Sequence, residues 1–181
     1  MKVWYLKFKV NDYVNLWSAD KIDIETQRTF DGRSQINNWK PVRAVMIYPG
    51  DTRPLPNVTD FSSFIPIFDA KASDAFMPLM KDAVELLPIE YEGATWFGIN
   101  VTKVLDAIDH EKAEPVRLST GKIIRFEKYA FKPEVIQGHN IFKITDKKLF
   151  CEFVSDEFKT LAEEAGLVGF NFQLVWNSEI E

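Results

Sequence analysis

The alternation of apolar and polar residues is clearest near the end of the chain. Between positions 170 and 176, a large apolar residue occupies every second place. These places are Phe170, Phe172, Leu174 and Trp176. A period of two is typical of a strand with one buried face. We therefore expect a strand that turns these four side chains toward the core.

The segment directly before this strand has the pattern of a helix. Ser155 is a natural N-cap residue, and the two acidic residues after it suit the positive start of a helix. Gly166 stands where a left-handed C-cap residue is needed. Apolar residues recur three to four positions apart, at Phe158, Leu161, Ala162 and Ala165.

The same two periodicities predict the other elements. Expected strands cover residues 3–10, 22–25, 42–48, 64–68, 86–91, 95–101, 114–118, 122–130 and 150–154, and one more begins at 141. Expected helices run from a cap at Asp69 or Ser73 to about residue 80, over 102–109 and over 133–137. Gly32 is expected to end a tight turn with a positive φ.

This order of elements predicts an α+β fold, with mostly antiparallel sheets and a few short helices. We expect one domain over residues 1–181, because no linker rich in glycine or serine divides it. Ser-Asp-x-Phe occurs at 73–76 and again at 155–158. Two packed strand–helix–strand units, about 1–110 and 111–181, would explain this echo. Chance reuse of a common helix start would also explain it.

Composition narrows the class of protein. Hydrophobic residues make up 46% of the chain and aromatic residues 14%, so it can bury enough apolar surface to fold, and disorder is excluded. The net charge of -5 argues against a nucleic-acid partner, which normally meets a basic face. The single cysteine, Cys151, cannot form an intramolecular disulfide, and we expect a buried thiol. The start of the chain lacks a signal-peptide core, and no stretch suits a transmembrane helix. We therefore expect a cytoplasmic protein without a membrane partner.

Residues of the kinds that carry catalysis or bind metals are scattered along the chain. The two histidines are His110 and His139, and the zinc-protease pattern that begins at His110 has Glu114 in place of its second histidine. No nucleophile elbow, phosphate loop or dinucleotide fingerprint is present. The sequence therefore predicts no catalytic residue, no metal ligand and no cofactor.

One alternative reading is a metal-dependent hydrolase or nuclease. Glu157 and Lys159 have the E-x-K spacing of such enzymes, in which both residues project from a strand into a shared metal site. Here they fall on the first turn of the expected helix, where the helix dipole explains Glu157 on its own. A small-ligand-binding or scaffold protein is a further alternative.

A run of carboxylates follows the region of the helix expected at 102–109. It comprises Asp106, Asp109, Glu111 and Glu114. The plain interpretation is a solvated face. The sharper interpretation is an anionic patch that binds a basic partner and speeds its association. These four residues are our candidate partner-binding site.

Several segments, taken in order, are similar to known immunity proteins. They are FDG at 30–32 with WKP at 39–41, IPIF at 65–68, ELLP at 85–88, NVTKVLDAID at 100–109, YAF at 129–131, IFK at 141–143, VSDEF at 154–158 and AGLVGF at 165–170. On these segments the chain resembles family eleven of the bacterial polymorphic-toxin immunity proteins, which is related to a myxobacterial swarming-associated protein. The second half matches more closely, and residues 11–29 and Pro78 depart from the pattern.

The resemblance implies a cytoplasmic immunity protein that binds a cognate toxin and blocks it without catalysis. The partner toxin differs between members, so neither its identity nor its docking face follows from the resemblance. No catalytic residues come with the family. A stoichiometric inhibitor needs a preorganised surface more than it needs acids and bases with shifted pKa values. This fits a chain in which residues of catalytic types are scattered.

Overall fold

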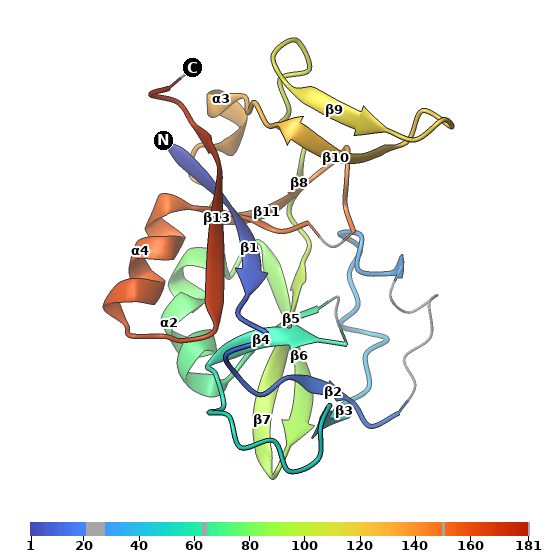
Figure 1. The fold of residues 1–181 in the computed structure, drawn as a ribbon, viewed down its shortest axis with the longest axis vertical. Coiled ribbons are helices and arrows are strands. Elements are labelled where there is room, and N and C mark those ends of the chain that lie inside the picture. Colours follow the sequence, from blue (N-terminus) through green and yellow to red (C-terminus); the bar gives the residue numbers. More distant parts are fainter. Residues whose placement is uncertain (21–27, 63–64, 150, 181) are drawn as a thin grey trace.

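The computed structural model describes residues 1–20, 28–62, 65–149 and 151–180, and it has the α+β architecture that the sequence predicts (Figure 1). The strands are β1 (Lys2–Phe8), β2 (Leu16–Ser18), β3 (Val42–Met46), β4 (Val58–Phe61), β5 (Ile65–Phe68), β6 (Val84–Tyr91), β7 (Ala94–Val101), β8 (Val104–Leu105), β9 (Glu114–Arg117), β10 (Ile123–Lys128), β11 (Ile141–Ile144), β12 (Phe153–Ser155) and β13 (Phe170–Asn177). The helices are α2 (Ala70–Met80), α3 (Pro133–Ile136) and α4 (Asp156–Glu164).

Six strands close into a small barrel in the order β2-β3-β6-β7-β5-β4. The long β6–β7 hairpin, which turns at Gly93, forms its tip at one end of the molecule (Figure 1). Closure pairs the strand edges with one another and leaves an interior that side chains must fill. They are apolar and buried, and include Leu16, Phe61, Ile65, Ile67, Leu87 and Ile89.

A second sheet has the order β13-β1-β12-β11-β8, and both of its faces are buried. On β1, Leu6 belongs to the core beneath the helices, with Trp4 and Phe8 packed against it. Val3 belongs to the core on the other face, with Tyr5 packed against it. That second core also holds residues from α3 and from the β9–β10 hairpin. The strict alternation of β1 therefore serves two cores at once.

Helices α2 and α4 lie side by side (Figure 1). Helix α4 packs on β1 and β12 of this sheet, whereas α2 packs on β5 and β7 of the barrel. Ser155 caps α4 as predicted, accepting a hydrogen bond of 3.1 Å from the backbone N–H of Phe158. Gly166 has the expected positive φ of 60°. The cap of α2 is Asp69, whereas Ser73 is buried within the helix, so the repeated tetrapeptide plays two different roles. Its two phenylalanines nevertheless meet, because Phe76 stacks on Phe158 with ring centroids 4.0 Å apart.

The prediction of a helix over residues 102–109 is wrong. Val104 and Leu105 instead form β8, which pairs in parallel with β11 beside Lys143 and Ile144. The apolar spacing that suggested a helix is met in another way, since Ile108 is buried and bridges to Phe131. Tertiary pairing decided the outcome where a short apolar run fitted both structures.

The expectation that Leu174 faces inward is also wrong. The register shifts between Val3, opposite Trp176, and Trp4, opposite Leu174, so Val175 is an extra residue on β13. Such a β-bulge interrupts the alternation of side chains. Phe170 and Phe172 pack beneath the helices, Trp176 joins the opposite core, and Leu174, at the switch, is 43% exposed.

Some expectations fall outside the described residues. The short strand expected at 22–25 lies there, as do the first residues of the strands expected at 64–68 and 150–154. The described parts of those two segments contain β5 and β12. Gly32 takes the predicted positive φ of 102°, and Cys151 is buried as expected.

Candidate functional site

The four predicted partner-binding carboxylates lie on the loop and turn between β8 and the start of β9. Two backbone hydrogen bonds fasten this segment, from Asp109 N–H to the carbonyl of Ala130 (2.9 Å) and from Lys132 N–H to that of Ala107 (2.8 Å). Ala107 and Ile108 anchor it in the core. The acidic residues therefore sit on a fixed loop and not, as expected, behind a helix.

The structure divides the four carboxylates into two kinds. Asp106 is exposed and pairs with Lys132 at 3.3 Å, and Asp109 pairs with Lys112 at 3.6 Å. Asp109 also accepts the backbone N–H of Glu111 at 3.1 Å. The side chains of Glu111 and Glu114 are exposed, and neither forms an ion pair within the described part of the chain. The second kind is the one available to a partner.

A fifth carboxylate, Asp146, joins this segment from the turn between β11 and β12. Its Oδ1 lies 3.1 Å from Nε2 of His110. One ligand atom each from Asp106, His110 and Asp146 lie within 4.8 Å of one another, close enough to hold a metal ion together. Sequence spacing could not have found this group, because Asp146 reaches it only through the pairing of β11 with β8.

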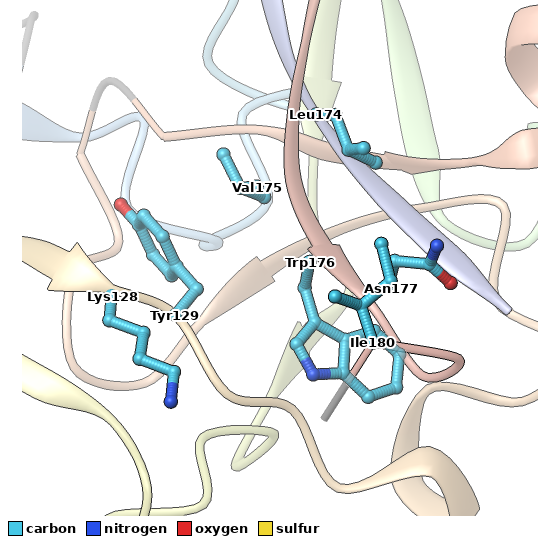
Figure 2. Close-up of a pocket in the computed structure, with 7 residues that line it drawn as sticks. All are labelled: Lys128, Tyr129, Leu174, Val175, Trp176, Asn177 and Ile180. Atoms are coloured by element: carbon cyan, nitrogen blue, oxygen red, sulfur yellow. The ribbon is translucent and has the colours of Figure 1, made fainter.

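A shallow groove of about 270 Å³ lies at the bulge of β13. Figure 2 shows Lys128 and Tyr129, at the end of β10, on one flank and residues from the end of the chain on the other. That second flank is formed by Leu174, Val175, Trp176, Asn177 and Ile180. The lining is mainly apolar, so the groove suits an apolar side chain of a partner better than it suits chemistry on a substrate.

A separate apolar patch lies on the outside of the barrel. Trp17 on β2 and Val45 on β3 stand directly opposite one another, and each is 40% exposed. Tyr48, just beyond β3, is more exposed still. Exposed aromatic residues in such clusters are frequent anchors of protein interfaces. The sequence pattern predicted β3 but gave no sign of which of its faces is outside.

The pair proposed for the hydrolase alternative does not converge. Glu157 and Lys159 are two positions apart on the first turn of α4, and side chains so spaced on a helix point to different faces. The ammonium group of Lys159 bonds Glu163 and lies 5.0 Å from the centre of the Trp4 ring. Glu157 instead lines a shallow depression beside Leu79 and Thr160.

Cys151 has the properties of a structural thiol. Burial raises its pKa to about 12, with the neighbouring charge of Glu152 adding to the effect against opposing lysines. A thiol with so high a pKa is protonated at neutral pH and is a poor nucleophile. Burial likewise raises the pKa of Tyr5 and Tyr129, two phenols that interact with this thiol.

Residues 84–177 match the model of the Immunity protein family (Imm11), which is slightly more than half of the chain. The chain belongs to this family. The matched region begins with β6 and ends with β13, so it contains the acidic segment and every residue that lines the groove of Figure 2 except Ile180. Among curated proteins, none is significantly similar in sequence.

The Imm11 match includes some of the candidate surfaces and leaves out another. The acidic segment and most of the groove lie within it, whereas the Trp17–Val45 patch lies in the part of the chain before residue 84. Membership of an immunity family indicates a toxin-immunity role and points away from enzymatic activity. Of the helices in the described residues, none is both long and apolar enough to span a membrane.

Proposed function

We propose that this immunity protein neutralises a cognate bacterial toxin in the cytoplasm by stoichiometric binding, without chemistry of its own. The observation that carries the proposal is the match of residues 84–177 to the Imm11 family. Binding would cover the active site of the toxin or the groove that takes its substrate. The toxin is expected to carry a basic surface.

The architecture supports a binder. Tight inhibition is favoured when the surface that binds is already ordered, because little conformational entropy is then lost on association. Here a closed barrel and a sheet buried on both faces hold the loops in place. Backbone hydrogen bonds hold the acidic segment at Ala107 and Asp109, so the backbone that carries its carboxylates is already in place before a partner binds.

We propose the acidic segment, Asp106, Asp109, Glu111 and Glu114, as the face that meets the toxin. Glu111 and Glu114 would contribute most, because Asp106 and Asp109 already have lysine partners. Unpaired surface carboxylates attract a basic surface over a range set by the ionic strength and so raise the association rate.

Co-expression tests the proposal. The toxin encoded beside this gene should stop growth when expressed alone, and this protein should restore it. The purified proteins should co-elute as a complex of fixed stoichiometry, and the toxin should be inactive within it. Continued killing, with both proteins folded and expressed, would contradict the proposal. Protection by amounts far below those of the toxin would instead favour an enzyme.

A further inference from the structure

Asp146 is the most unusual polar residue near the acidic segment. Its side chain is only 9% exposed, and Oδ1 lies 3.1 Å from Nε2 of His110. Oδ2 is fully buried and has no hydrogen-bond partner in the described part of the chain. Both oxygens belong to one carboxylate group, so the unpartnered oxygen lies next to the one that contacts His110.

A buried carboxylate oxygen without a partner is costly. Leaving such a group unsatisfied costs about 1–3 kcal/mol, and more when the group is charged. Native proteins satisfy nearly all their buried polar atoms with protein groups, water or ions. The imidazole of His110 contacts only one of the two oxygens of Asp146. A cation that Asp146 binds through this second oxygen would satisfy it.

The neighbouring groups supply the remaining ligands. The ligand atoms of Asp106, His110 and Asp146 lie within 4.8 Å of one another, and each can approach a common centre. One imidazole nitrogen with two carboxylate oxygens is a donor set that zinc and similar divalent ions accept. Three protein ligands would leave one position for water.

One nearby cation opposes metal binding. The ammonium group of Lys132 lies 3.3 Å from Oδ2 of Asp106 and equally far from its backbone carbonyl. Oδ1 of Asp106, on the other side, has only a long contact of 3.4 Å with the hydroxyl of Thr145. Asp106 can therefore offer Oδ1 to a metal and keep Lys132 on Oδ2. The positive charge of Lys132 would lower the affinity.

We propose that Asp106, His110 and Asp146 bind one divalent metal ion of the zinc class. The ion would join the acidic segment to the turn after β11, which is 36 residues further along the chain from His110 to Asp146. Such a bridge would hold the segment more rigidly and reduce its negative charge. The site stands on its own geometry and does not depend on the role proposed above.

The test uses the complete, untagged protein after treatment with a chelator. Zinc chloride is titrated in by calorimetry, and cobalt chloride is followed by its visible absorption. We expect one ion per chain and a higher midpoint of thermal unfolding with zinc, since binding to the folded state alone stabilises it. His110→Gln and Asp146→Asn should each weaken binding at least about tenfold.

His139→Gln is the matched control, because it removes the other histidine of the chain without touching the cluster. This variant should bind as the unchanged protein does. His110 is half exposed, so His110→Gln should fold even if the buried Asp146 variant does not, and circular dichroism checks this. Failure to bind saturably, or loss of binding in His139→Gln with retention in His110→Gln, would overturn the proposal.

Discussion

Two regions of this molecule use the same pair of groups, a lysine and a carboxylate, in opposite ways. Inside, Lys143 on β11 bonds Glu152 at 2.7 Å, and their side chains are 2% and 9% exposed. Outside, Lys132 and Asp106 pair at 3.3 Å and are 33% and 70% exposed. Burial, more than chemistry, therefore decides whether such an ion pair is needed by the fold or adds little to its stability.

The interior pair joins three parts of the chain. The ammonium group of Lys143 also donates to the backbone carbonyl of Phe30 at 2.9 Å. It therefore ties the N-terminal segment, through β11, to Glu152 beside β12. Charges removed so completely from water must be paired, because either one alone would be strongly disfavoured.

A second, partly exposed contact joins the segment after Phe30 to the barrel. Glu85 on β6 accepts hydrogen bonds from the backbone N–H of Gln35 (2.7 Å) and the side-chain amide of Asn100 (2.9 Å). The hydroxyl of Ser34 donates to its other oxygen. Burial acts to raise the pKa of Glu85, but these hydrogen bonds outweigh it and lower the pKa below the usual 4.5.

Breaking the interior ion pair should give the largest effect. Lys143→Met leaves Glu152 buried without its partner and should lower the free energy of unfolding by about 3–5 kcal/mol. Denaturant titration measures the loss. Adding Glu152→Leu removes the stranded charge and should recover much of it, whereas Lys132→Met on the surface should cost at most about 1 kcal/mol. Similar losses for the two lysine variants would remove the distinction between the regions.

Glu85→Gln should have an intermediate and pH-dependent effect. The folded pKa of Glu85 lies below its unfolded value, so the carboxylate stabilises the fold fully above that value. This stabilisation is lost as the pH falls through the folded pKa. At neutral pH the variant should be less stable by about 1 kcal/mol, because solvent screens the hydrogen bonds of this partly exposed carboxylate.

The difference between this variant and the unchanged protein should shrink as the pH falls below 4.5. Denaturant titrations at several pH values measure it. Glu90→Gln, an exposed change on the same strand, is the control and should show little difference at any pH. A gap for Glu85→Gln that stays constant down to low pH would mean that the charge contributes nothing.

Charge reversal on the surface should have the smallest effect on stability. Glu111→Lys with Glu114→Lys should change the free energy of unfolding by no more than about 0.5 kcal/mol. Association with the toxin should nevertheless slow by about tenfold or more at low salt and become less dependent on salt. Stopped-flow kinetics measures both.

Two comparisons make this experiment specific. Glu164→Lys, on the exposed face of α4, should leave the association rate nearly unchanged. Trp17→Ala tests the barrel patch instead, and a slower or weaker association in that variant alone would move the binding face to β2 and β3. An unchanged association rate in the double variant would mean that the acidic segment is only a solvated face and does not bind the toxin.

Local patterns in the sequence predicted the elements whose signals are local. Ser155 and Gly166 marked the ends of α4, and the alternation along β1 predicted which side chains share a face. Such signals depend on residues only a few positions apart, so they survive in any tertiary context. The resemblance to immunity proteins was confirmed by the family match over residues 84–177.

What could not be predicted depends on residues far apart in sequence. The local pattern around Val104 is compatible with a helix, and only its pairing with β11 makes this segment a strand. The Lys143–Phe30 contact joins residues separated by 113 positions, and nothing in either local pattern signals it. Asp146 reaches His110 only after the sheet has formed. The acidic run was visible in the sequence, but its division into paired and unpaired carboxylates required the structure.

Because of the bulge on β13, the number of residues in this strand matters as much as their identity. The one extra residue, Val175, allows this edge strand to place Phe170 and Phe172 in the core on one face of the sheet and Trp176 in the core on the other. Without the bulge, strict alternation would place Trp176 on the same face as Phe170 and Phe172, away from the core that it shares with Val3. An extra residue inserted between Leu174 and Trp176 should therefore be tolerated far less well than the exchange of one apolar residue for another.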